Sequence, residues 1–257
     1  MDKQYNPFSL EGKTIIVTGA SSGIGAQCAI DCSRMGATVV LIGRNEDRLN
    51  LTLSEMKDPD KHCIISYDLV DFEDFSSLVN QIVTNVGPVS GLVNCAGIST
   101  TMPLNLANKE TLDHFFQTNV YSAYMLTKEV AKRGVIAKDG LSVIFLSSVM
   151  GSVGEQGKSI YGMTKGALLS GARSLACELA KKRVRVNTVS PGCVITPINE
   201  DLPHITDPDK RKALEAQHLL GLGEVTDVSN ACIYLLSDAS RWVTGTNIFV
   251  DGGYTCK

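Results

Sequence analysis

The sequence lacks the marks of several large classes of protein. Its formal net charge of −3 gives no electrostatic reason to expect nucleic acid or an acidic membrane as a partner. No apolar run approaches the roughly 20 residues that cross a bilayer, and residues 1–7 do not have the basic-then-apolar layout of a signal peptide. The eight cysteines include no Cys-x-x-Cys pair, which disfavours both a metal site and disulfides. We therefore expect a cytoplasmic protein without a metal, membrane or nucleic-acid ligand.

What the chain does have is a regular alternation of short apolar runs and amphipathic stretches. With 257 residues, 44% of them hydrophobic, it is long enough for one large domain over residues 1–257. Buried strands are predicted at 14–17, 37–42, 62–67, 91–93, 141–146 and 185–189. Because helical stretches separate them, we predict an α/β protein with a doubly wound parallel sheet, the Rossmann fold. Its ligand crevice would lie beyond the carboxyl ends of the strands.

A glycine-rich turn follows the first predicted strand. Glycines 19, 23 and 25 of Thr18–Gly25 would let the backbone turn sharply and approach a ligand closely. A helix predicted from there to about Met35 would direct free N–H groups and the positive end of its dipole toward a pyrophosphate. The Gly-x3-Gly-x-Gly spacing differs from the commoner Gly-x-Gly-x2-Gly, so alone it indicates either a dinucleotide site or a purely structural turn.

The end of the second predicted strand bears on which dinucleotide would bind. An acidic side chain there would bind the ribose 2′-hydroxyl of NAD, but the chain has Gly43 and then Arg44. A guanidinium in place of a carboxylate favours a 2′-phosphate, hence NADP(H), with NAD(H) as the alternative. Asn45 is predicted to cap the next helix. After the third strand, Asp68 could accept a hydrogen bond from an adenine amino group or cap the helix predicted over 71–86.

One helix opening carries an unusual pair of side chains. Tyr161 and Lys165 fall on the same face as Leu168 and the apolar residues after it. A lysine there could extend to water, or its ammonium could shift the proton affinity of the neighbouring phenol, as in catalytic sites. Asn119 likewise interrupts the apolar stripe of a helix predicted over about 105–133. It would either satisfy a neighbouring backbone group or hold a water or a carbonyl.

Together with these features, a set of short motifs resembles the short-chain dehydrogenase/reductase family. In chain order the motifs are TGASSGIG (18–25), DL (68–69), NCAG (94–97), TNV (118–120), SS (147–148), YGMTK (161–165) and PGCVIT (191–196). They span nearly the whole chain, from Gly12 to Gly253. The departures are Cys95, where an asparagine is common in the family, and an N-terminal extension before Leu10. The resemblance implies a seven-stranded parallel sheet whose last strand lies within 244–253.

The resemblance also implies a role for each catalytic residue. Tyr161 would be the general acid/base, and Lys165 would lower the pKa of the phenol and hold the nicotinamide ribose. Ser148 would donate to the substrate oxygen, Ser147 would be structural, and Asn119 would anchor a water in a proton relay through Lys165. The residues implied to bind the cofactor are Gly19, Ser21, Ser22, Gly23, Ile24, Arg44, Asp68, Leu69, Asn94, Ala96, Gly97, Tyr161, Lys165, Pro191, Gly192, Val194 and Thr196.

Two further regions bear on the substrate and on assembly. Residues 197–222 mix turn formers with one short amphipathic helix, and we expect a mobile lid that sets specificity. The lid's histidines, His204 and His218, have no spacing that suggests metal binding or catalysis. The helix predicted over 160–181 has a second face of small or apolar residues, which predicts burial against another subunit. The family's usual assembly is a homotetramer.

The sequence therefore predicts an NADP(H)-dependent oxidoreductase that interconverts a carbonyl and a secondary alcohol, similar to 3-oxoacyl-carrier-protein reductases. Sugar, polyol and steroid dehydrogenases of the same family, using NAD(H) or NADP(H), are alternatives. Basic residues at 210–212 would suit a carrier protein as partner. A regulator that binds nucleotides without catalysis is disfavoured by the complete set of Asn119, Ser148, Tyr161 and Lys165. A sugar-nucleotide epimerase is disfavoured by the glycine spacing and by the lack of a C-terminal substrate domain.

Overall fold

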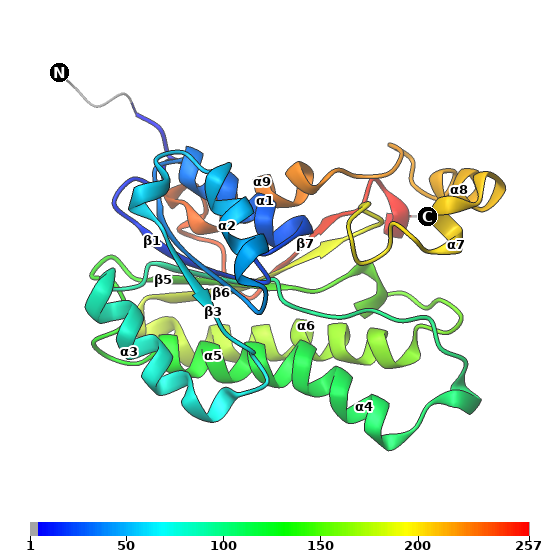
Figure 1. Ribbon diagram of the computed structural model, residues 1–257, viewed down its shortest axis with the longest axis horizontal. Helices are drawn as coiled ribbons and strands as arrows, with labels where there is room; N and C mark the ends of the chain where they lie inside the picture. Colours follow the sequence, from blue (N-terminus) through cyan, green and yellow to red (C-terminus); the bar gives the residue numbers. More distant parts are fainter. Residues whose placement is uncertain (1–4, 257) are drawn as a thin grey trace.

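The computed structural model describes residues 5–256, apart from the side chains of Pro203 and His204. Its centre is a seven-stranded parallel sheet with the strand order β3-β2-β1-β4-β5-β6-β7 (Figure 1). The strands are β1 (Thr14–Thr18), β2 (Thr38–Gly43), β3 (Cys63–Ser66), β4 (Gly91–Asn94), β5 (Leu141–Leu146), β6 (Val184–Pro191) and β7 (Asn247–Val250). The predicted Rossmann fold with seven parallel strands is confirmed.

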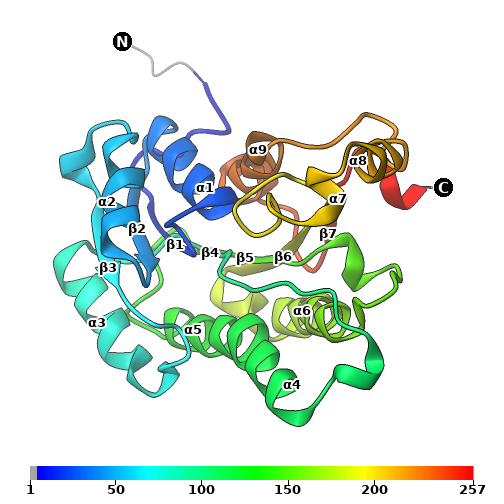
Figure 2. The ribbon, with the colours of Figure 1, turned by 45° about the vertical axis from the view of Figure 1, so that its right-hand side comes forward.

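Alternate residues of the central strands face opposite sides of the sheet, which creates two cores. Ile16 of β1 packs in one core, and its neighbours Ile15 and Val17 pack in the other. Figure 2 shows a helix layer on each side of the sheet. One layer contains α1 (Gly23–Arg34), α2 (Glu46–Ser54) and α9 (Val225–Leu236), and the other contains α3 (Phe75–Asn85), α4 (Lys109–Phe116), α5 (Ser122–Val130) and α6 (Ser159–Leu179).

The helix predicted over 105–133 is wrong as one continuous element. Helix α4 ends at Phe116, a π-helical turn occupies Gln117–Tyr121, and α5 begins at Ser122. The wide turn contains Asn119, whose side chain bonds to groups outside its own helix. Single π-helical turns of this kind are common where a helix carries a functional side chain.

The segment 197–222 contains two short helices instead of the one predicted. They are α7 (Pro203–Thr206) and α8 (Pro208–Glu215). The separation follows from local chemistry, because Pro208 occupies the first turn of α8 and the Asp207 carboxylate accepts hydrogen bonds from the backbone of Asp209 and Lys210. Within residues 5–256, every helix is too short or too polar to cross a bilayer.

The strand order reverses between β1 and β4, whose carboxyl ends therefore diverge into helices on opposite faces. In an open parallel sheet this switch point creates a crevice at the carboxyl edge. The turn after β1 and the turn after β4 border it, and the ends of β5 and β6 lie beside them. The predicted motifs are thereby brought to one edge of the sheet.

Candidate active site

The glycine-rich turn after β1 is shaped by close backbone contacts. Gly19 has a φ of +66°, and a Cβ there would lie 2.9 Å from the backbone of Ala96. A Cβ at Gly25 would lie 2.3 Å from the carbonyl oxygen of Gly19. Ser22 is the N-cap of α1 and its side chain makes no capping bond, so the helix presents free N–H groups. These are the conditions for binding a phosphate at a helix N-terminus.

A cavity of about 440 Å³ lies over this turn, and we call it the turn cavity. Eleven of the residues predicted to bind cofactor line it: Gly19, Ser21, Ser22, Gly23, Ile24, Arg44, Asp68, Leu69, Ala96, Gly97 and Thr196. The structure places Asn94 elsewhere. Its side chain is buried, its amide donates to Thr127 Oγ1 at 3.3 Å, and it lines neither this cavity nor the one beside it. Asn94 can therefore act on a ligand only through the turn that it supports.

Two arginines line the turn cavity. Arg44 follows β2 directly, and Arg48 lies in the first turns of α2, four residues later. Both are exposed, and neither guanidinium has a hydrogen bond or ion pair within the described part of the chain. Asn45 caps α2 as predicted, since its side chain accepts from the Arg48 N–H at 2.9 Å. Sequence analysis missed Arg48, although its i, i+4 relation to Arg44 could have indicated it.

Asp68 also lines the turn cavity. Its carboxylate accepts a hydrogen bond from the backbone N–H of Val70 at 3.2 Å. Helix α3 begins only at Phe75, after a 3-10 turn, with Asp74 as its N-cap. The alternative that Asp68 caps this helix is therefore wrong, and its second carboxylate oxygen is available to a ligand.

Thr18 holds the turn after β4 against the glycine-rich turn. Its hydroxyl accepts hydrogen bonds from the backbone N–H groups of Cys95 and Ala96, both at 3.1 Å. The substitution of Cys95 for the family's asparagine does not disturb this arrangement, because the bonds are made by the backbone. Gly97 follows, and a Cβ there would lie 3.2 Å from Asn119 Oδ1 and 3.5 Å from Lys165 Nζ. The turn thus leads directly to the predicted catalytic residues.

Tyr161 and Lys165 lie one helical turn apart at the start of α6. The Lys165 ammonium lies 5.6 Å from the Tyr161 ring centroid and donates to the carbonyl of Leu146 at 2.7 Å. Lys165 is only 5% exposed, so it does not extend to water. Burial lowers its pKa to about 8, because a charged ammonium is poorly solvated there.

The expected lowering of the Tyr161 pKa is not found in the chain alone. Burial raises the pKa of this phenol, and a hydrogen bond with Ser148 acts in the opposite direction without overcoming it. Lys165 contributes little here because its ammonium points to the carbonyl of Leu146. Neighbouring Ser147 donates to the carbonyl of Lys165 at 2.9 Å, which is the structural role predicted for it.

Asn119 joins three elements beneath the tyrosine. Its Oδ1 accepts from the Ile98 N–H at 2.8 Å, and its Nδ2 donates to the Ile98 carbonyl and to Thr164 Oγ1, both at 3.0 Å. The side chain thus bonds to a backbone segment, including its carbonyl, and a role of Asn119 toward a water stays a prediction. These bonds fix the segment after Gly97 against α6, and hence the position of Tyr161.

A second cavity, of about 240 Å³, opens above Tyr161, and we call it the tyrosine cavity. The predicted residues that line it are Ser148, Tyr161, Lys165, Pro191, Gly192, Val194 and Thr196. Ile24, Gly97 and Thr196 line both cavities, so the two are continuous. A ligand that lies in the turn cavity could therefore extend to the phenol.

His218 closes the far side of the tyrosine cavity, and sequence analysis assigned it no role. Its Nε2 accepts from the backbone N–H of Cys193 at 3.1 Å, and its Nδ1 lies 3.0 Å from the carbonyl of Leu214. The ring also packs on Tyr254 with centroids 4.8 Å apart. His218 thus ties the segment after α8 to the turn after β6, a link that no sequence spacing indicates.

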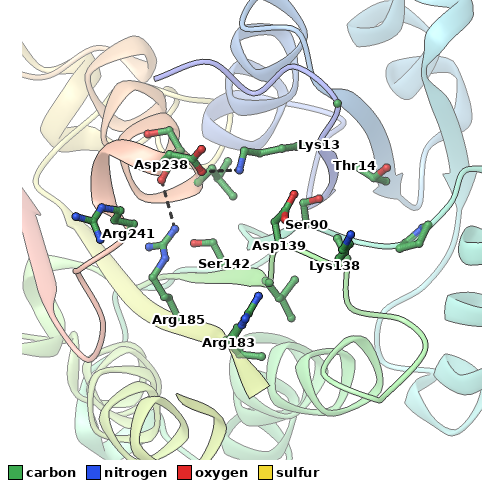
Figure 3. Close-up of a pocket in the computed structure, with 18 of the residues that line it drawn as sticks. Lys13, Thr14, Ser90, Lys138, Asp139, Ser142, Arg183, Arg185, Asp238 and Arg241 are labelled. Atoms are coloured by element: carbon green, nitrogen blue, oxygen red, sulfur yellow. Dashed lines mark hydrogen bonds and ion pairs between the residues drawn. The ribbon is translucent and has the colours of Figure 1, made fainter. Parts of the chain in front are cut away.

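The largest cavity, of about 1070 Å³, lies at the opposite edge of the sheet, beside the amino ends of β1, β5 and β6 (Figure 3). Several of its charges are already paired: Lys13 forms an ion pair with Asp238 at 2.8 Å, and Arg185 donates to the carbonyl of Leu235 at 2.7 Å. None of the predicted site residues lines it. Size alone would point away from the predicted site, since Ser148, Tyr161 and Lys165 all lie at the other edge.

The fold and the carboxyl-edge site are those of an oxidoreductase that uses a nicotinamide dinucleotide. Residues 19–255 match the profile of the family described as enoyl-(acyl carrier protein) reductase. The chain belongs to the short-chain dehydrogenase/reductase family and acts on CH–OH groups or the corresponding carbonyls.

Relatives of known activity cover the chain almost completely. L-xylulose reductase of Bos taurus is 35% identical over 95% of this chain and 97% of its own length. L-rhamnose 1-dehydrogenase (NAD(P)(+)) of Sphingomonas is 32% identical over 95% of this chain and 96% of its own. The structure of a gluconate 5-dehydrogenase from Burkholderia cenocepacia, solved with NADP and tartrate, superposes with a TM-score of 0.90 at 26% identity and covers 98% of both chains.

Proposed function

We propose that this chain catalyses the NADP(H)-dependent interconversion of a secondary alcohol and a carbonyl in a small hydroxylated substrate. The observation that carries the proposal is the continuity of the two cavities. Ser148 and Tyr161 line one of them, Arg44 and Arg48 line the other, and Gly97 belongs to both. A dinucleotide anchored at the arginines would therefore reach the phenol.

The residues of the turn cavity fit NADP(H). The uncapped N-terminus of α1 would bind the pyrophosphate, and Arg44 and Arg48 would bind the 2′-phosphate. Asp68 would accept from the adenine amino group. When bound, the nicotinamide supplies or accepts the hydride of the reaction. NAD(H) has no 2′-phosphate and would leave both guanidiniums without a partner, so it is the second choice.

Residues of the tyrosine cavity would carry out the proton transfer. Tyr161 would protonate the carbonyl oxygen during reduction and accept the proton back during oxidation, while Ser148 would donate to the same oxygen. Burial raises the pKa of Tyr161, so the phenol is protonated at neutral pH and ready to act as the acid in reduction. Lys165, with a pKa of about 8, would bind the nicotinamide ribose. Asn119 would fix both groups, and its predicted role in holding a water remains part of this proposal.

A sugar- or polyol-sized substrate suits the tyrosine cavity better than a long acyl chain. Its volume is about 240 Å³, and the relatives act on L-xylulose and L-rhamnose. Reduction of a 3-oxoacyl chain on a carrier protein is the second candidate, favoured by the description of the matching profile. The basic residues of α8 support it little, because Lys210 pairs with Asp207 and Arg211 with Glu215.

The experiment that tests this function follows NADPH and NADH absorbance over a panel of keto-sugars, acetoacetyl thioesters and keto-steroids. We expect the highest kcat/KM with a keto-sugar and NADPH. Highest activity with an acetoacetyl thioester would establish the second candidate. Failure of every carbonyl, with cofactor binding intact, would overturn the proposal.

The substrate lid and the single-domain organisation over residues 1–257 are further parts of the proposal. Residues 197–222 contribute Ile198, Leu202, Leu214 and His218 to the tyrosine cavity. This segment would close over the substrate and set its specificity. If so, exchanging residues there should change KM for different carbonyls while leaving the affinity for NADPH in place.

We also propose that the chain forms a homotetramer through the outer face of the α5–α6 layer. Met163, Tyr121 and Tyr124 are large side chains about half exposed on these elements and the adjoining turn, which favours their burial by another copy. A monomer at micromolar concentration in sedimentation would contradict this.

The eight cysteines are all free thiols, as suits the cytoplasmic location that we propose.

A further inference from the structure

Lys158 stands in the tyrosine cavity, and neither the sequence motifs nor the mechanism gives it a role. It precedes α6 directly and lines the cavity. Its ammonium lies 5.9 Å from the ring centroid of Tyr161. The side chain is partly buried, and within residues 5–256 its Nζ has no hydrogen bond or ion pair. Apart from this contact with the Tyr161 ring, the ammonium has no partner in the described part of the chain, and it lies beside the group that would deliver the proton.

This position is unfavourable for a lysine on two physical grounds. Lys158 is the N-cap residue of a 21-residue helix and makes no capping bond there. A positive charge at a helix N-terminus opposes the dipole, where serine or aspartate would stabilise the helix. Partial burial also lowers the pKa of the ammonium, and the charge of Glu155 only partly offsets this. Apart from the contact of the ammonium with the Tyr161 ring, the described part of the fold gains no bond from the Lys158 side chain, which points to a ligand as its partner.

We infer that the substrate carries a carboxylate and that Lys158 binds it while Tyr161 meets the reacting oxygen. The inference rests on the proposed function, since it fixes the substrate's reacting oxygen at Tyr161. The Lys158 ammonium lies 5.9 Å from the centroid of the Tyr161 ring, so one small substrate can contact both the ammonium and the phenol. The substrate class is then a hydroxy acid, and the product is the corresponding keto acid.

Apart from Glu155, the other titratable groups of the cavity are bonded to the backbone or uncharged. Both ring nitrogens of His218 bond to the backbone, and the Lys165 ammonium bonds to the carbonyl of Leu146. Burial raises the pKa of Cys193 to about 11, which keeps its thiol neutral. Glu155 is exposed at the cavity's edge, where it would repel a carboxylate without blocking Lys158. Removing its charge should therefore strengthen acid binding.

The test uses pairs of carbonyl substrates that differ only in a carboxylate. Suitable pairs are 5-ketogluconate with sorbose and acetoacetate with 4-hydroxy-2-butanone. For the full-length wild-type enzyme with NADPH, we expect kcat/KM to be higher for the acid of a pair. In Lys158→Gln the ratio of acid to neutral kcat/KM should fall about 10- to 100-fold, as for the loss of a hydrogen bond to a charged group.

Three variants complete the test. Lys158→Arg should retain much of the preference for the acid, and Glu155→Gln should lower KM for the acid. Lys181→Gln removes the same charge from the exposed 3-10 turn that follows α6 and should leave the ratio as it is in wild type. Inhibition by malonate, competitive with substrate, should weaken in Lys158→Gln in parallel.

Two results separate the inference from the proposed function. Efficient reduction of neutral carbonyls, with an acid-to-neutral ratio that Lys158→Gln does not change, would overturn the carboxylate inference and leave the proposed function standing. Absence of NADPH oxidation with every substrate, acid and neutral, would overturn both.

Discussion

Replacing Lys165 by methionine should make the protein more stable while it removes activity. The pKa of the buried ammonium falls from 10.5 to about 8, which corresponds to about 3 kcal/mol of unfavourable free energy at neutral pH. Methionine has a similar length and carries no charge. The variant loses the buried hydrogen bond from a charged ammonium to the Leu146 carbonyl, worth about 2 kcal/mol. The free energy of unfolding should therefore rise by about 1 kcal/mol.

The pH dependence makes this prediction specific. A lysine with a lower pKa in the folded state destabilises the fold fully below pH 8, where both states bind the proton. The penalty disappears as the pH rises from about 8 toward the unfolded value of 10.5. Urea unfolding at pH 7 and at pH 10 gives the free energy of unfolding of wild type and of Lys165→Met. The difference between the two proteins should be smaller at pH 10 than at pH 7. A variant less stable than wild type at pH 7, or a gap that does not change with pH, would refute the reasoning.

The remaining predictions concern the cofactor, the turn and the segment over the cavity. Arg44→Asp should weaken NADPH binding about 10- to 100-fold and NADH binding much less; equal losses in titrations with the two cofactors would contradict the assignment. Gly25→Ala would place a methyl group 2.3 Å from a backbone carbonyl oxygen of the same turn; it should cost about 1–3 kcal/mol of stability and abolish NADPH binding, whereas Gly154→Ala, with open space around it, should do neither. His218→Leu removes the acceptor of the Cys193 N–H and should raise KM for the carbonyl with NADPH affinity unchanged; an unchanged KM would show that this link is dispensable.

The sheet and the glycine-rich turn could be predicted because they depend on short-range patterns. The apolar runs around Ile16 and Ile144 are strands by length and composition, and their parallel pairing follows from the helices between them. Tyr161 and Lys165 fall on one helix face by spacing alone. The cap at Asn45 was equally local, since it depends on a single backbone N–H three residues away.

What could not be predicted depends on contacts between distant segments. The bonds of Asn119 to Ile98, 21 residues away, explain both the π-helical turn and the interrupted helix. The role of His218 depends on Cys193, 25 residues earlier. The role inferred for Lys158 depends on its position in the lining of the tyrosine cavity, which the sequence does not show. In each case the side chain looks ordinary in the sequence, because its partner is supplied by the tertiary fold.

The central claim is that Tyr161 moves the proton at a site that holds NADPH independently of it. The most direct measurement compares wild type and Tyr161→Phe in NADPH oxidation, with the best carbonyl of the panel, and in NADPH binding by fluorescence titration. We predict that turnover falls by about 100- to 10 000-fold while the Kd for NADPH stays within about threefold. Turnover within tenfold of wild type would contradict the account.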